Sequence, residues 1–194
     1  MVPTADYDIT GIDLSDNRYV VEQSLIRNKY KALGSAGNTV LRGKQKAFEM
    51  KEEFPFADAS GTDVFTVKAA GIVDVAGNYV LSDARTGIDL VLLSNDFSVF
   101  RDTWTIRDAD TESKLAEINS RGAVTTVARN YLPLGEWIPH EYEITDADGR
   151  HVGSIRGKLL SLRDRYTVTI DDASTVPKKP VVAAAMVIDA IQAN

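Results

Sequence analysis

The sequence predicts an all-β protein, a roughly twelve-stranded antiparallel closed β-barrel that encloses one hydrophobic C-terminal helix. Two observations predict this fold. A short motif, in which an aromatic residue opens a strand that ends in an Asp-Ala or Ser-Ala turn, recurs along most of the chain. After the last copy this pattern stops, and the chain from Val181 onward is almost entirely apolar. With 194 residues, the chain is long enough for one substantial core.

The repeated motif defines the strands. Successive copies follow at nearly constant intervals, with one longer interval after Trp104, and each unit has room for two short strands and two turns. Apolar and polar residues alternate in these runs, which is the period of a strand with one buried face. Six units therefore predict about twelve strands. The six copies, of which the first and last are weaker, begin at Tyr30, Phe54, Tyr79, Trp104, Tyr142 and Tyr166.

The remaining segments follow from their place in the repeat. We expect extended chain over residues 19–33, a turn at 34–38 and a returning strand from residue 39 to 46. Residues 44–53 and 111–120 have a composition that suits helices, but their position predicts strands. Two prolines exclude residues 131–139 from a central strand, so we expect an irregular loop there. Aspartate is a good turn former, and it opens the later turns, which we place at 58–63, 83–87, 108–112 and 146–149.

The apolar C-terminal segment predicts a buried helix at residues 180–192. Pro180 suits the first helical position, and the Ala-rich composition favours a helix. A helix that is apolar on all sides is either buried or spans a membrane, and a span needs roughly 20 apolar residues. A barrel wider than eight strands leaves room inside, and a central helix can fill it. We therefore expect one domain over 1–194, with a barrel at 19–176 around this helix. Asp189 would lie at the barrel mouth or form an ion-pair latch.

Composition excludes several classes of function. The chain has no cysteine, which excludes disulfides and thiolate chemistry, and its two histidines cannot form a three-histidine zinc site. The net charge of -6 disfavours nucleic acid as a partner. There is no secretory signal or transmembrane segment, so a cytoplasmic protein is expected. Asp108 and Asp146 open segments that lack the later ligands of a calcium loop, which predicts hairpin turns there. No catalytic residue, metal site or cofactor is predicted.

Two similar motifs supply the candidate binding residues. Arg42-Gly43-Lys44 and Arg156-Gly157-Lys158 each lie on a strand that returns from a turn. Strand alternation places Arg42, Lys44 and Lys46 on one face of the first strand. It likewise places Arg156 and Lys158 on one face of the second. These side chains form either a basic patch that holds phosphate head groups or the solvated outer wall of the barrel. The candidate ligand-binding residues are Arg42, Lys44, Lys46, Arg156 and Lys158.

The chain resembles the LURP-one-related family, which shares its fold with Tubby proteins and phospholipid scramblases. The resemblance covers about residues 19–191, and it is carried by the segments RGKQKAFEMKEEF at 42–54, HEYEITDADG at 140–149, LSLRDRY at 160–166 and the helix at 181–191. It implies a twelve-stranded barrel around a hydrophobic helix. The family's motifs are structural, so the resemblance assigns no catalytic residue.

Two hypotheses on function follow. The first is a non-enzymatic module that binds anionic phospholipid or phosphate groups, which would place it peripherally at a membrane. The second is a scaffold or protein-interaction domain without a small ligand. An enzyme would need a polar cluster of perturbed titratable groups, and the sequence offers none. Scramblase relatives usually carry Cys-rich or Pro-rich segments that this chain lacks, which disfavours scramblase activity.

Overall fold

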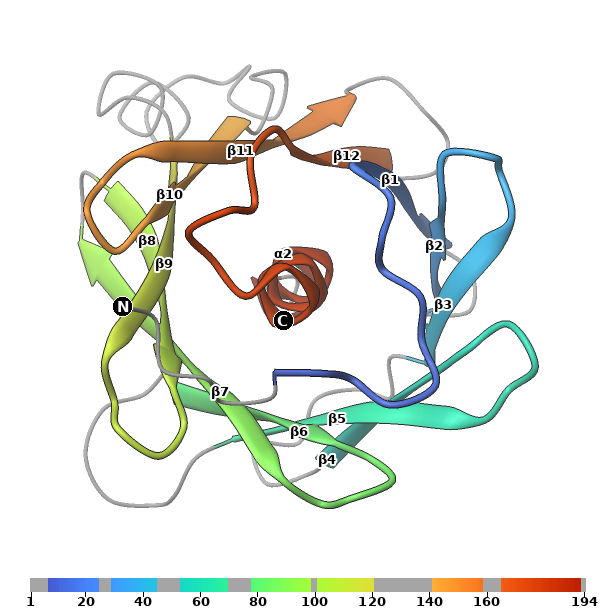
Figure 1. The fold of residues 1–194 in the computed structure, drawn as a ribbon. Coiled ribbons are helices and arrows are strands. Elements are labelled where there is room, and N and C mark those ends of the chain that lie inside the picture. The colour runs from blue at the N-terminus through green and yellow to red at the C-terminus, as the bar shows by residue number, and fades with distance from the viewer. Residues whose placement is uncertain are drawn as a thin grey trace.

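The structure, a computed structural model, is a closed antiparallel β-barrel with one helix along its axis (Figure 1). It describes residues 7–24, 29–44, 53–69, 78–98, 101–120, 141–158 and 165–192. The prediction of a twelve-stranded barrel around a C-terminal helix is confirmed. The barrel strands are β1 (Arg18–Ser24), β2 (Lys29–Leu33), β3 (Thr39–Lys44), β4 (Glu53–Ala57), β5 (Asp63–Ala69), β6 (Asn78–Asp83), β7 (Asp89–Ser98), β8 (Arg101–Asp108), β9 (Lys114–Ser120), β10 (Glu141–Asp146), β11 (His151–Lys158) and β12 (Arg165–Ile170).

The strands form a simple meander that closes on itself. Each strand pairs with its neighbours in the sequence, and β1 pairs antiparallel with β12, from Arg18 opposite Thr169 to Glu22 opposite Arg165. Closure leaves no open sheet edge, so every strand has two hydrogen-bonded neighbours. It also brings the two ends of the sheet, which are far apart in sequence, next to each other.

The aromatic residues of the repeat face the inside of the barrel. Five of them are at most 7% exposed, and Tyr79 is half-buried beside Trp104, at a ring-centroid distance of 6.2 Å. They lie on every second strand, from β2 to β12, and pack around the central helix. The motif that reveals the strands is therefore the inner wall of the barrel.

The central helix α2 (Lys178–Gln192) is apolar because it is surrounded by strands. Residues 181–188 are at most 2% exposed. The hydroxyl of Tyr166, on β12, donates a hydrogen bond of 2.5 Å to the carbonyl of Met186. The helix begins two residues before the Pro180 start that the sequence predicts. Proline is tolerated throughout the first turn, where backbone N–H groups have no intrahelical acceptor, so it does not fix the first residue.

One mouth of the barrel carries the predicted tight turns. At four of these turns the leading aspartate uses one carboxylate oxygen, Oδ1, to accept hydrogen bonds from backbone N–H groups two to four residues later. This is the Asx-turn chemistry that makes aspartate a turn former. The hairpin turns predicted at Asp108 and Asp146 are thus present in the structure.

A segment that the sequence left unassigned covers the same mouth. Residues 7–17, the N-terminal strap, run along the rim of the barrel opening and lead into β1 (Figure 1). Ile9, Ile12 and Leu14 are buried against the core. The strap is tied to the helix, because Lys178 Nζ donates to the Ser15 carbonyl at 2.5 Å and to Asn17 Oδ1 at 2.8 Å.

Some expectations fall outside the described residues. The strand assigned to 44–53 and the loop at 131–139 lie almost wholly there, as do Lys46 and the side chain of Asp189. The strand expected within 111–120 is present as β9. In the part of the chain that the structure describes, no helix has the length and apolar character needed to cross a bilayer.

Candidate anion-binding face

A row of charged positions crosses the outer wall over five adjacent strands. Neighbouring strands place Arg42 opposite Lys31, Lys31 opposite Glu22, Glu22 opposite Arg165, and Arg165 opposite Lys158. The row therefore runs across β3, β2, β1, β12 and β11, in that order. A second row places Lys44 opposite Lys29, and Arg156 lies two residues from Lys158 on β11. We call this set the basic face: Lys29, Lys31, Arg42, Lys44, Arg156, Lys158 and Arg165.

The described side chains of the basic face are exposed to solvent. Lys31, Arg42, Arg156 and Arg165 all lie on the outside of the barrel. For Lys29, Lys44 and Lys158 the structure gives the register position only. The five strands form one continuous arc of the wall, beginning at β11 and ending at β3 (Figure 1).

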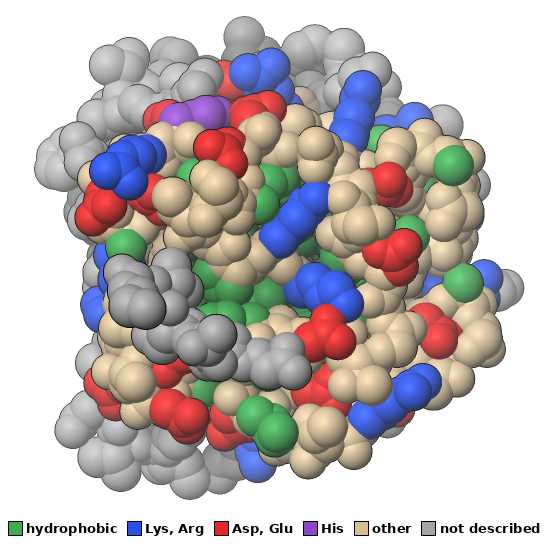
Figure 2. Space-filling model, viewed as in Figure 1, with side chains coloured by type: hydrophobic (Ala, Val, Ile, Leu, Met, Phe, Trp, Pro, Cys, Tyr) green, Lys and Arg blue, Asp and Glu red, His purple; other side chains and the backbone are tan. Residues whose placement is uncertain are grey.

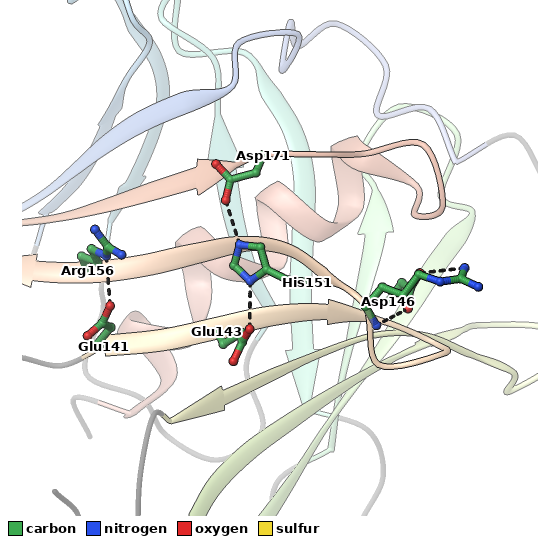
Figure 3. A network of polar contacts seen from close by, with 7 residues as sticks. Glu141, Glu143, Asp146, His151, Arg156 and Asp171 are labelled. Atoms are coloured by element: carbon green, nitrogen blue, oxygen red, sulfur yellow. Dashed lines mark hydrogen bonds and ion pairs between the residues drawn. The ribbon is translucent and has the colours of Figure 1, made fainter.

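Ion pairs engage one half of the basic face. Arg165 pairs with Glu22, whose side chain is only 15% exposed, and Arg156 Nε lies 3.1 Å from Glu141 Oε1 (Figure 3). In the described ranges neither Lys31 nor Arg42 forms an ion pair. Lys31 and Arg42 therefore have no carboxylate partner among the described residues, whereas the β11–β12 half is partly neutralised.

The structure links the two sequence motifs and adds residues between them. Arg42 and Arg156 lie on strands four positions apart, which at about 4.8 Å per strand is roughly 19 Å along the wall. Lys31 and Arg165 fill this interval. Sequence reasoning missed both residues, because nothing local shows the register in which β1 pairs with β12 when the barrel closes. Their only signal was that each alternates with a buried Tyr, Tyr30 or Tyr166.

The glycines of the two motifs have a packing role. Gly43 lies opposite Tyr30, and Gly157 lies opposite Tyr166, so each glycine faces an aromatic residue of the repeat. A Cβ on Gly43 would lie 2.7 Å from the Phe56 ring, which is stacked on Phe65. The cation-Gly-cation pattern thus combines outward charge with inward space for an aromatic ring.

The wall on the other side of the barrel carries both signs of charge. A hollow of about 440 Å³ lies over β4 to β7, and its lining includes Glu53, Lys68 and Asp89. Ser82 Oγ donates to Asp89 at 2.6 Å in this hollow. Red and blue side chains also alternate around the turn-bearing mouth, over an apolar centre (Figure 2). Neither region shows the run of cations found on β3 to β11.

A histidine clamp adjoins the basic face at the turn-bearing mouth. His151 Nδ1 lies 2.9 Å from Glu143 Oε1, and Nε2 lies 2.8 Å from Asp171 Oδ2 (Figure 3). Both ring nitrogens can donate only in the protonated imidazolium. The hydrogen bond to Asp171, helped by Glu143, raises the pKa of His151 above its usual value. The clamp joins β10, β11 and the segment that leads to α2.

Metal chemistry has no candidate among the described residues, where no group of three or more His, Asp or Glu side chains is arranged to hold a metal ion. The turn aspartates are engaged by backbone N–H groups instead. At Asp83, burial is outweighed by hydrogen bonds from Thr10 and Thr86, which lower the pKa of its carboxyl. At Asp108, the Tyr7 hydroxyl and Thr111 lower the pKa.

Comparisons with known proteins agree with this architecture. The family model described as LURP-one-related matches residues 39–189. An X-ray structure of a protein from Arabidopsis thaliana is similar over 97% of this chain and 98% of that one, with a TM-score of 0.57. The identity is 10%, so this likeness shows the fold alone. No curated protein matches the sequence.

Proposed function

Because the chain belongs to the LURP-one-related family and has a Tubby-like fold, we propose that it is a non-enzymatic module whose basic face binds anionic phospholipid or other phosphate groups. The observation that carries this proposal is the transverse row of cations on β3, β2, β12 and β11. Lysine and arginine are the side chains that best bind phosphate oxygens.

The distribution of charge supports the proposal more than the total does. The whole chain has a net charge of -6, yet the basic face gathers seven cations around Glu22 and Glu141. Charges within a Debye length, about 8 Å at physiological salt, act together on a ligand, whereas more distant ones are screened. An anion at this wall therefore meets a positive local potential in spite of the acidic remainder.

The non-enzymatic part of the proposal rests on the family and the fold. Charged groups on the convex outside of a barrel remain hydrated, and they bind ligands without the excluded-water environment that catalysis uses. Binding of lipid would hold the protein peripherally at a cytoplasmic membrane surface. The alternative, a protein-interaction domain with no small ligand, predicts that the same wall ignores lipid.

Vesicle flotation tests the proposal. The full chain is mixed with vesicles of phosphatidylcholine alone or with added phosphatidylserine, at low and at physiological salt. We expect flotation with the anionic vesicles only, decreasing as salt screens the attraction. Absence of flotation with anionic vesicles at low salt would overturn the proposal in favour of the protein-interaction domain.

Two matched charge reversals locate the binding surface. Lys31→Glu reverses a charge in the β2–β3 half of the basic face. Lys68→Glu makes the same change at an exposed lysine of the wall over β4 to β7, which carries both signs of charge and which we call the mixed wall. Each lysine near an anionic surface contributes about 1 kcal/mol, so reversal is expected to weaken vesicle binding roughly thirtyfold at Lys31. We expect less than a threefold change at Lys68. Equal losses in the two variants would contradict the assignment to the basic face.

A further inference from the structure

The basic face is divided by its own carboxylate. Glu22 lies at the centre of the row, with Lys31 and Arg42 on one side and Arg165 and Lys158 on the other. Its side chain is 15% exposed and pairs with Arg165, so it is held in place within the wall. An anion cannot lie across the middle of the row without meeting this negative charge. The cations therefore form two sites.

The distance between the two sites exceeds the size of a phosphate group. Cations opposite each other on neighbouring strands are separated by about 5 Å at the backbone, so one phosphate can contact both members of a pair. The midpoint of the Arg42–Lys31 pair and the midpoint of the Arg165–Lys158 pair are three strand spacings apart, or about 14 Å. One phosphate cannot bridge them, whereas head groups in a bilayer offer many anions over such a span.

We propose that the basic face binds a bilayer surface through at least two anionic head groups at once, one on each side of Glu22, and that Glu22 limits the affinity by competing for Arg165. This inference rests on the proposed function and names its ligand as an anionic lipid surface. The site formed by Lys31 and Arg42 is the stronger one, since these cations have no ion-pair partner among the described residues. The site at Arg165 binds a head group only as its contact with Glu22 is shared or lost.

The convex shape of the wall supports a surface as the occupant. The barrel's outer face is convex around β1, with β11 and β12 on one side and β2 and β3 on the other, so it does not enclose a small ligand (Figure 1). Binding of this kind gains from several weak contacts whose effects multiply. A soluble phosphate compound can occupy only one of the two sites and receives no such gain.

The first experiment measures binding to phosphatidylcholine vesicles as their phosphatidylserine content is raised stepwise from none. We expect binding to rise at least with the second power of the anionic fraction, and Lys31→Glu combined with Arg42→Glu to reduce it to the first power. Millimolar glycerol phosphate should leave the protein on the vesicles. First-power binding of the unmodified chain, displaced by glycerol phosphate, would overturn the two-site inference while the proposed function stands. No binding at any fraction would overturn both.

A second experiment isolates the role of Glu22. Glu22→Gln removes the competing charge and preserves the shape of the side chain, so we expect three- to tenfold tighter binding to anionic vesicles. The matched control is Glu53→Gln, which makes the same change at an exposed position of the mixed wall and should alter binding less than twofold. Unchanged or weaker binding by Glu22→Gln would contradict the competition. Displacement of the protein from vesicles by an RNA oligonucleotide, added at the same concentration of negative charge as the anionic lipid, would show a general polyanion site. That result would overturn the lipid assignment.

Discussion

The turns that begin at Asp83 and at Asp108 are two copies of one structure, in consecutive units of the repeat, that differ in how they hold the N-terminal strap. In both, Oδ1 accepts from two backbone N–H groups and a threonine hydroxyl, of Thr86 in the first turn and Thr111 in the second. In both, the aspartate N–H donates at 2.9 Å to the carbonyl five residues later. The second carboxylate oxygen distinguishes them. Asp83 Oδ2 accepts from the backbone of Thr10 at 2.6 Å, and Asp108 Oδ2 accepts from the Tyr7 hydroxyl at 2.5 Å.

The turn at Asp58 shows what the local chemistry does alone. Its Oδ1 accepts from the N–H groups of Ser60 and Thr62 in the same way, yet among the described residues it has no hydrogen bond to the strap. Its neighbourhood stays exposed, whereas Asp83 and Asp108 are 2% and 5% exposed. The same type of aspartate turn thus forms a solvent-exposed hairpin at Asp58, whereas at Asp83 and Asp108 it also binds the N-terminal strap.

The largest expected effect is the loss of the Asp83 carboxylate. Asp83→Ala leaves the N–H groups of Thr10, Arg85 and Thr86 without their acceptor, and unpaired polar groups of this kind each cost about 1 kcal/mol or more. We expect about 3 kcal/mol of destabilisation in urea unfolding. Asp108→Ala should lower the free energy of unfolding by about 2 kcal/mol, because the freed Tyr7 hydroxyl can form a hydrogen bond to water instead. Asp58→Ala, the control at a turn without a hydrogen bond to the strap, should lower the free energy of unfolding least. Equal decreases in unfolding free energy for all three variants would mean that the hydrogen bonds to the strap do not stabilise the protein.

Tyr7→Phe tests the strap bond separately from the turn. It removes one hydrogen bond to a charged acceptor, which corresponds to about 1.5 kcal/mol, and leaves the Asp108 turn intact. Urea unfolding of the double variants checks the partner. The loss should be non-additive with Asp108→Ala, because both changes remove the same bond, and additive with Asp83→Ala. If the effect of Tyr7→Phe were additive with both aspartate changes, the hydrogen bond between Tyr7 and Asp108 would not contribute to stability.

The last residues of the two turns provide a smaller contrast. Gly87 has a φ of +71°, and the equivalent Glu112 has a φ of +57°, in the left-handed region that side chains rarely adopt. We expect Gly87→Ala to destabilise by about 1 kcal/mol and Glu112→Gly to stabilise by about 0.5 kcal/mol, since the relief of strain is partly offset by the flexibility of glycine in the unfolded chain. Thermal unfolding measures both. A loss in Glu112→Gly would show that this turn is unstrained.

The pH dependence gives the smallest difference. The pKa values of Asp83 and Asp108 are lowered in the folded protein, so their contribution is fully present above the usual carboxyl pKa of about 3.9 and is lost as pH falls through the folded-state values. Unfolding free energy measured from pH 5 to pH 2 should therefore decrease. Tyr7→Phe should make the decrease shallower, because the Tyr7 bond is the main cause of the shift at Asp108. An unchanged slope would contradict that cause.

Much of the fold could be predicted because its signals are local. The repeat spacing, the turn aspartates and the apolar C-terminal segment each act within a few residues, and together they predicted twelve strands and a buried helix. The helix start was displaced from Pro180 to Lys178 because proline is acceptable anywhere in the first turn. Of the candidate site, the sequence supplied Arg42, Lys44, Arg156 and Lys158 but not Lys31, Arg165 or Glu22.

The sequence alone therefore determined the barrel, its aromatic inner wall and its apolar centre, since alternation and turn chemistry are properties of neighbouring residues. Tertiary structure alone decided the register in which the first and last strands meet and which segment lies over the mouth. Glu22 and Arg165 are 143 residues apart, and Tyr7 and Asp108 are 101 residues apart. Contacts over such separations form only when the barrel closes, and they leave no period in the chain. The candidate site and the strap depend on closure, because both consist of residues that closure brings together.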